Sequence, residues 1–238
     1  MLLPPQDVKR FYRMWFALLH YVNKQLHIAA DFPEAPDEEI VSTEVVVQLR
    51  DALWVHDEIR ERFIADNPAQ LPAADLAIVE SWQYRVAGSF SIVRSLQKYT
   101  ILLPQATPVH AYGVLGLVST IEEILPLPLP VYARAVLLPF EHHIIYDSLL
   151  FPYNVLLGPG IRRDLQEQYR TLQEREGIIT SLLPEDQEIS ATNQRNEISA
   201  RNRKVLTAFR RELPKEGSVN IWLTCMSPRL RISRMKHC

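Results

Sequence analysis

The pattern of apolar and polar residues changes its period near Gly88. Before this residue, apolar side chains recur at three- and four-residue steps, the spacing of helices with one buried face. After it, short runs of β-branched, aromatic and leucine residues are bounded by turn residues, which is typical of strands. The densest run spans residues 131–160, with polar breaks at 141–143 and 147–148. The pattern predicts a helical region, residues 1–87, and a β region after it.

Three helices are expected in the N-terminal region. They span residues 6–27, 37–65 and 73–86, and segments that contain proline separate them. The first helix carries a stripe of aromatic side chains at helical spacing, which includes Phe11 and Trp15. A ligand pocket is the alternative use of such a stripe, but core packing is far commoner, and we interpret it as core.

Short strands with tight connections follow the helices. We expect strands at residues 90–96, 99–103 and 111–118, and a hairpin within residues 131–157. Because no long helix separates these strands, an antiparallel sheet that curls into a small barrel of SH3-like shape is favoured. The expected fold class is α+β, with a helical N-terminal region, a small antiparallel SH3-like β-barrel and C-terminal helices.

The barrel region is expected to include one further helix and to extend over residues 88–183. This helix spans residues 161–176, and the glycine that follows is well placed to end it. Residues 178–182 either return as a last strand or pack as a tail. Residues 184–198 are polar and predict a linker, and residues 199–216 predict a basic amphipathic helix.

The composition is that of an ordinary globular protein. Apolar residues make up 47% and charged residues 23% of the 238 residues, and the formal net charge of −2 gives no global attraction to nucleic acid or to acidic membranes. The chain has neither an apolar run as long as a spanning helix nor the pattern of a secretory signal, so we expect no membrane partner. Two cysteines provide neither a disulfide framework nor a four-ligand zinc site, which favours a cytoplasmic location.

Motifs of catalysis are few in this sequence. Seven glycines provide no phosphate-binding loop, and neither a Gly-x-Ser-x-Gly nor a His-Glu-x-x-His motif occurs. His142, His143 and Asp147 are the candidates for a metal site or a hydrolase site. A solvated hairpin turn and the close of a strand are the commoner uses of these residues. We therefore assign no catalytic residue, no metal and no cofactor, and whether the protein is an enzyme stays open.

Two groups of basic residues are candidate binding sites. Gly160, Arg162 and Arg163 lie at a helix start, where free amide groups and arginines converge on a bound anion. The alternative is that both arginines lie in solvent beside Asp164. The second group is the basic face of the helix expected after residue 198, which offers contacts to nucleic acid, to an acidic partner or to its own domain. This group consists of Arg201, Arg203, Lys204, Arg210 and Arg211.

Several runs of the chain resemble a family of bacterial and plasmid-borne proteins to which no activity is assigned. They are AVLLPF at 135–140, IIYDSLLFPYNVLLGPGIRR at 144–163, EGIITSL at 176–182 and KVLTAFRREL at 204–213. The resemblance extends over residues 50–213. Some members carry an appended SEC-C-type zinc module, for which this chain lacks the cysteines. The resemblance supports the domain layout and implies no catalytic residues.

The segment from residue 217 to residue 238 differs from the rest of the chain. It contains no acidic residue, whereas the preceding 216 residues contain all 28, and both Cys225 and Cys238 fall within it. It also lacks the helices that the family resemblance implies. A shifted reading frame accounts for this, because one permissible codon choice encodes a helix-forming peptide in the neighbouring frame. The segment is then poorly ordered and its cysteines have no function; the alternative is a natural, disordered basic tail.

Three functions are compatible with the sequence. The leading one is a non-enzymatic interaction or regulatory module that contacts a protein partner through the barrel and the basic helix. The second is nucleic-acid binding, because small barrels of this shape often bind nucleic acids and the basic helix supplies phosphate contacts. The third is a hydrolase that works through Asp147 with His142 or His143.

Overall fold

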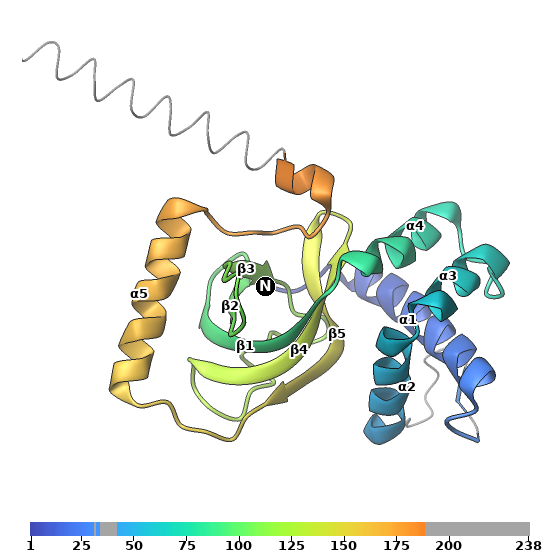
Figure 1. The fold of residues 1–238 in the computed structure, drawn as a ribbon, viewed down its shortest axis with the longest axis horizontal. Helices are drawn as coiled ribbons and strands as arrows, with labels where there is room; N and C mark the ends of the chain where they lie inside the picture. The colour runs from blue at the N-terminus through green and yellow to red at the C-terminus, as the bar shows by residue number, and fades with distance from the viewer. Residues whose placement is uncertain (31, 34–41, 189–238) are drawn as a thin grey trace, which may run out of the picture. The chain divides into compact units, whose positions relative to one another are not determined.

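A computed structural model describes residues 1–30, 32–33 and 42–188 of the chain. Figure 1 shows a group of helices on one side of a closed barrel and a single long helix along the opposite side. The predictions for the basic helix at 199–216, for its surface residues and for the tail at 217–238 lie outside the described residues.

The N-terminal region is helical, as predicted. The helices are α1 (Pro5–Leu26), α2 (Thr43–Val55), α3 (Asp57–Asp66) and α4 (Ala73–Ser81), followed by a short 3-10 helix at Trp82–Tyr84. The prediction of one helix over residues 37–65 is wrong, because the described part of that range forms two helices that meet at His56. The backbone of His56 is not helical (φ −113°, ψ 67°), and Asp57 and Glu58 supply acidic side chains to the first turn of α3.

The aromatic stripe of α1 is core, as the sequence predicts. Phe11 and Trp15 are fully buried, and both rings contact Trp82, with centroid separations of 6.0 and 5.7 Å. Edge-on aromatic pairs of this kind contribute about 1 kcal/mol beyond the area they bury. The rings therefore pack α1 against Trp82, which lies where the chain passes from the helices to the barrel.

The strands form a closed barrel, which confirms the α+β fold class. They are β1 (Val86–Ser95), β2 (Thr100–Pro104), β3 (Tyr112–Val114), β4 (Val131–Phe140) and β5 (His143–Pro152). Their order around the barrel is β1-β2-β3-β5-β4. The two predicted hairpins are β1–β2 and β4–β5.

One strand pair departs from the antiparallel barrel that was expected. β3 and β5 run parallel and pair through Val114 and Ile144, whereas the other neighbouring pairs are antiparallel. The reason is directional. Strands that alternate in direction around a closed ring must be even in number, and this ring has five. Closure therefore requires a parallel pair, and residues 115–130 provide the connection that brings β4 back to β1.

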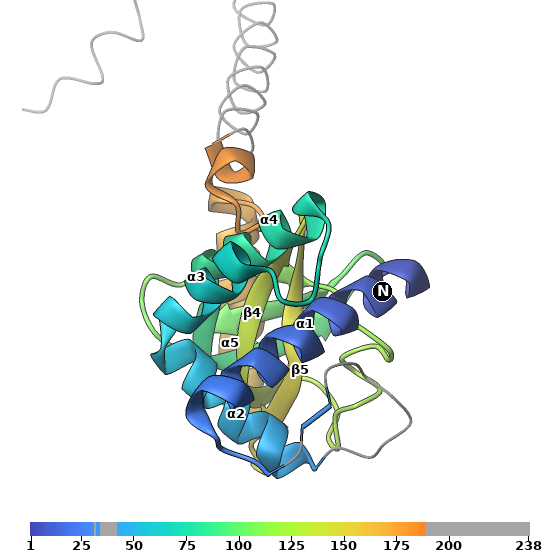
Figure 2. The same cartoon turned by 90° about the vertical axis from the view of Figure 1, so that its right-hand side faces the viewer.

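The helical region and the barrel share one hydrophobic core. Figures 1 and 2 show the helices gathered along the side of the barrel that β4 and β5 form. Large side chains from both regions are buried in that core: Trp15, Leu49 and Phe63 from the helices, and Phe90, Leu137 and Ile144 from the strands. Because the core is continuous, the barrel holds the helices in a fixed place beside β5.

The helix on the opposite side, α5 (Pro159–Arg175), covers the outer face of the barrel near β1 and β2. Leu165, Tyr169 and Leu172 form its buried face, and they pack against Val93 and Ile101. These positions follow helical spacing, so a single apolar stripe is enough to seat the helix on the sheet.

The chain returns to the barrel after α5. Ile179 makes one parallel bridge to Tyr112 of β3, so residues 178–182 lie against the sheet edge. Residues 184–188, the start of the predicted linker, are helical. Among the described helices, none is both long enough and apolar enough to cross a bilayer.

Candidate interaction surface

A buried carboxylate joins β5 to α2. Asp147 is fully buried, and its Oδ2 atom accepts hydrogen bonds from Nη1 of Arg50 at 3.1 Å and from Nε1 of Trp54 at 3.4 Å. The backbone N–H of Leu149 donates to the other carboxylate oxygen at 3.3 Å. Burial raises the pKa of Asp147 to about 6, and the positive charge of Arg50 opposes that rise. These partners give Asp147 a role in holding the helices to the barrel.

The histidines predicted as candidates lie apart from this carboxylate. His142 and His143 are exposed at the β4–β5 turn, and Nδ1 of His142 lies 3.0 Å from Asp186. His143 precedes Asp147 by four residues on an extended strand, which separates them by about 13 Å. Among the described residues, Asp147 has no histidine as a hydrogen-bonding partner and no group of three His, Cys, Asp or Glu side chains is placed to hold a metal ion. The hydrolase hypothesis gains no geometric support.

The structure separates the two arginines of the predicted anion site. Nε of Arg162 donates to the carbonyl oxygen of Leu157 at 2.8 Å, and its Nη1 donates to that of Leu129 at 3.4 Å. The side chain of Arg163 is 81% exposed and lies 3.9 Å from Asp164. Gly160 has open space around its Cα atom. Arg162 therefore anchors a loop. The predicted alternative, in which both arginines lie in solvent beside Asp164, describes only Arg163.

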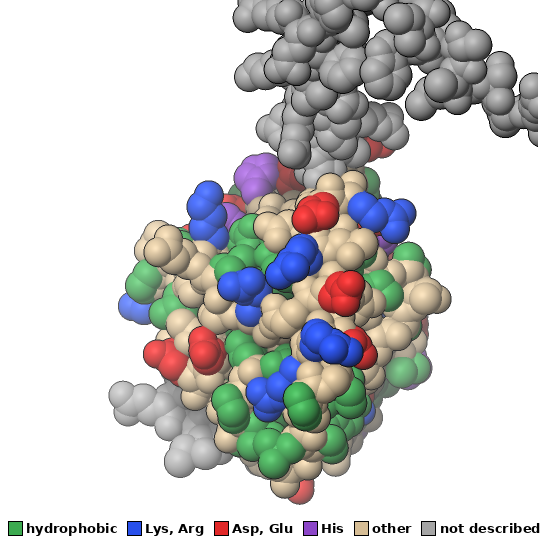
Figure 3. Space-filling model, turned by 90° about the vertical axis from the view of Figure 1, so that its left-hand side faces the viewer, with side chains coloured by type: hydrophobic (Ala, Val, Ile, Leu, Met, Phe, Trp, Pro, Cys, Tyr) green, Lys and Arg blue, Asp and Glu red, His purple; other side chains and the backbone are tan. Residues whose placement is uncertain are grey.

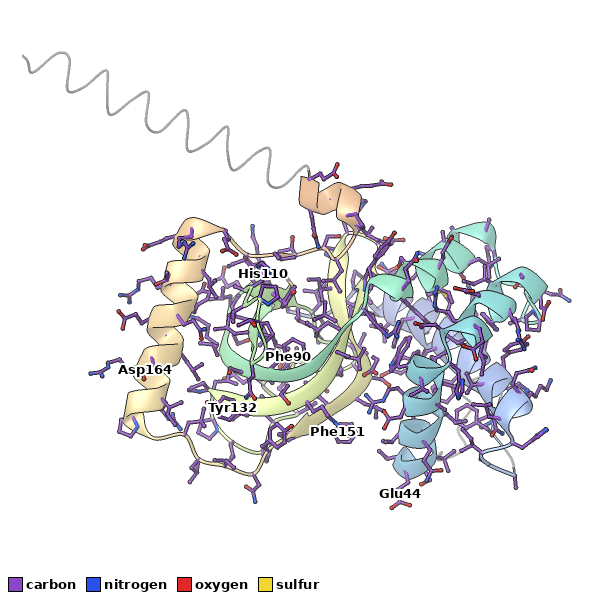
Figure 4. The ribbon with its side chains drawn as sticks, in the orientation of Figure 1. Glu44, Phe90, His110, Tyr132, Phe151 and Asp164 are labelled. Carbon is purple, nitrogen blue, oxygen red and sulfur yellow. The ribbon has the colours of Figure 1, made fainter. Side chains whose placement is uncertain are left out.

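A row of side chains crosses three strands on the outer face of the barrel; Arg134 is exposed, and Ser89 and Phe151 are half-buried. Ser89 of β1, Arg134 of β4 and Phe151 of β5 lie in register. The guanidinium of Arg134 lies 5.3 Å from the centroid of the Phe151 ring, and that of Arg50 lies 5.6 Å from it. The hydroxyl of Tyr153 lies 3.0 Å from Oγ of Ser89. Figure 4 shows Phe151 at the β5 side of this face, beside the helices.

Apolar side chains continue this row toward α5. Tyr153, Val155, Leu156 and Ile161 are 42%, 54%, 72% and 45% exposed. Figure 3, which looks onto α5, shows hydrophobic side chains gathered at the end where that helix begins. We name the set of Arg134, Phe151, Tyr153, Val155, Leu156 and Ile161 the 151–161 surface.

The loop that carries this surface is held in place. Leu157 is buried beneath α5, and its carbonyl accepts the hydrogen bond from Arg162. Tyr153 donates its backbone N–H to the carbonyl of Tyr132 at 2.8 Å. A loop whose backbone is anchored has less conformational entropy to lose when a partner binds.

The 151–161 surface was not among the sites predicted from the sequence. The signal was present in the run Pro152-Tyr-Asn-Val-Leu-Leu-Gly158, where large apolar residues stand among proline, asparagine and glycine. Turn residues predict a loop on the surface, and apolar residues in such a loop are a sign of contact. The basic residues at the helix start, Arg162 and Arg163, were predicted as the site instead.

No protein-family model, curated protein or solved structure matches this chain. The resemblance to the bacterial and plasmid-borne family therefore stays a prediction from the sequence, and a function has to be inferred from the geometry of the described residues.

Proposed function

We propose that the protein is a non-enzymatic interaction module of the cytoplasm that binds a protein partner through the 151–161 surface. The observation that carries the proposal is the anchored apolar loop, with Leu156 72% exposed at its tip. Clustered exposed apolar groups are typical of binding sites, and tyrosine, phenylalanine and arginine are enriched at protein interfaces.

The charges at this surface favour a partner with acidic residues. Arg134 is exposed, and its contact is the ring of Phe151; it makes no ion pair with any described residue. Arg163 extends beyond the other end of the loop and is 81% exposed. A segment that combines apolar side chains with aspartate or glutamate therefore fits this surface, because its acids gain cationic partners at the rim.

Nucleic-acid binding is the second proposal from the sequence, and it depends on the basic helix at 199–216. The described residues contain more acidic than basic side chains, so their net charge does not attract a phosphate backbone. We therefore rank the protein partner first.

Selection from a random peptide library on the immobilised full chain tests the proposal. We expect the selected peptides to combine apolar and acidic residues. Leu156→Ser and Arg134→Glu should each weaken the binding of a selected peptide by about tenfold or more, because one removes apolar contact and the other reverses a charge.

Val118→Ser and Arg62→Glu are the matched controls. Val118 is 70% exposed and Arg62 is exposed on α3, and neither belongs to the 151–161 surface. Peptides that bind Leu156→Ser and Arg134→Glu as tightly as the wild type would overturn the proposal, as would equal losses in the controls.

A further inference from the structure

A hollow of about 640 Å³ lies over β3, away from the 151–161 surface. Backbone pairing fixes both of its sides. Leu3 donates its N–H to the carbonyl of Gly116 at 2.9 Å on one side, and Gly113 donates to the carbonyl of Ile179 at 2.8 Å on the other. The hollow is thus bounded by the first residues of the chain, the segment after α5 and the two hairpin turns of the barrel.

Apolar side chains line part of the hollow. The ring of Tyr99 lies directly against Gly113, where a Cβ atom would stand 2.8 Å from the ring. Leu115 and Ile144 extend this lining, and both are buried in the barrel wall. A glycine in β3 therefore makes room for the ring, and the ring with its apolar neighbours offers a face for a planar group.

Basic side chains line part of the rim of the hollow. Lys98, His142 and His143 line it, and none of the lining residues is acidic. Two acids at the histidine turn have partners: Asp186 contacts His142, and Glu141 accepts a hydrogen bond from Arg10 at 2.6 Å. The hydrogen bond to Asp186 raises the pKa of His142, which favours its charged form.

We propose that this hollow binds a small organic anion, with a planar apolar body on Tyr99 and a carboxylate or phosphate group beside Lys98 and the two histidines. Pockets for small ligands have volumes of about 300–1,000 Å³ and combine an apolar lining with a few polar groups that set orientation. The volume and the lining of this hollow fall within that description.

Three probes that share one ring system test the proposal on the full chain: 1-naphthoate, 1-naphthyl phosphate and 1-naphthalenemethanol. Titration calorimetry is expected to show that at least one anion binds about tenfold more tightly than the neutral alcohol. The ratio of the two anions identifies whether the site prefers carboxylate or phosphate. Equal binding of all three, or binding of none, would overturn the proposal.

Variants locate the binding. Lys98→Met is expected to weaken the anions by about fivefold or more and to leave the alcohol unchanged, whereas Lys24→Met, an exposed lysine of α1, should change neither. Thr180→Phe is expected to abolish binding, because Thr180 is exposed at the wall and the larger ring occupies the hollow. Unchanged anion binding in Lys98→Met and Thr180→Phe would refute the site. Leu156→Ser should bind the probes as tightly as the wild type does. Loss of peptide binding at the 151–161 surface and loss of anion binding at the hollow can therefore be told apart.

Discussion

Arg50 of α2 donates a hydrogen bond to Asp147 of β5 at 3.1 Å, across 97 residues of sequence. Their side chains are only 3% and 0% exposed, so both charges are almost wholly removed from water. Removing one partner of such a pair leaves the other charge buried and alone, whereas replacing both with apolar groups does not. The pair therefore fixes where α2 lies on the barrel more than it adds to the free energy of unfolding.

Arg50→Met should lower the free energy of unfolding by about 3 kcal/mol, because Asp147 loses its cationic partner in a buried site. The double variant Arg50→Met/Asp147→Leu should recover most of that loss, since no buried charge remains. Urea unfolding of both variants and the wild type measures the difference. A double variant no more stable than Arg50→Met would contradict this account of the pair.

The stability that Asp147 contributes depends on pH in a defined direction. Burial raises its pKa from 3.8 to about 6, so the folded protein holds this proton more tightly than the unfolded chain does. The contribution is present in full below the unfolded pKa and is lost as the pH rises through the folded pKa. A shift of this size corresponds to about 3 kcal/mol.

Urea unfolding of the wild type and of Asp147→Asn, from about pH 4 to about pH 7, tests this direction. The free energy of unfolding of the wild type should fall relative to that of Asp147→Asn as the pH rises, because asparagine does not titrate. Two curves that stay parallel over this interval would show that Asp147 titrates normally.

Gly113→Ala should destabilise the barrel by about 1–3 kcal/mol, because the added Cβ atom would stand 2.8 Å from the ring of Tyr99 and the ring has to move. Gly160→Ala is the matched control. Nothing lies within 4 Å of a Cβ atom at that position, and alanine favours the helix in which Gly160 lies. Thermal unfolding of both variants gives the comparison, and equal effects would mean that the contact with Tyr99 tolerates a methyl group.

Arg162 and Arg163 should differ in what they contribute. Arg162→Met loses two hydrogen bonds to backbone carbonyls and should cost about 1–3 kcal/mol, while Arg163→Met should lie near zero, because its side chain is 81% exposed. Chemical denaturation measures both. A similar small effect for the two arginines would indicate that Arg162 does not anchor the loop.

Binding to nucleic acid separates the first proposed function from the second. We expect the full chain to show no salt-dependent binding to RNA of mixed sequence. Its described part contains more acidic than basic residues and does not attract the phosphate backbone. Fluorescence anisotropy at two salt concentrations measures this. Strong salt-dependent binding that Arg203→Glu/Lys204→Glu abolishes would favour nucleic acid as the partner.

The sequence by itself determined the local elements. The three- and four-residue spacing of apolar side chains was enough to predict α1 and its buried aromatic stripe, and short apolar runs between turn residues predicted the strands of both hairpins. These patterns succeed because side-chain direction repeats at a fixed interval in helices and in strands. Burial of one face therefore places apolar residues at that interval along the chain. The spacing of apolar residues did not reveal the break at His56, because it continues from one helix into the next.

Only the tertiary structure decided the partners of the polar residues. Asp147 meets Arg50 and Trp54 of α2 and no histidine of its own hairpin, and Arg162 donates to two carbonyl groups of its own chain. The parallel β3–β5 pair likewise results from closing an odd number of strands. The physical reason is common to these cases. The energy of a polar contact depends on the distance between groups and on their removal from water, and both are set when segments far apart in sequence meet.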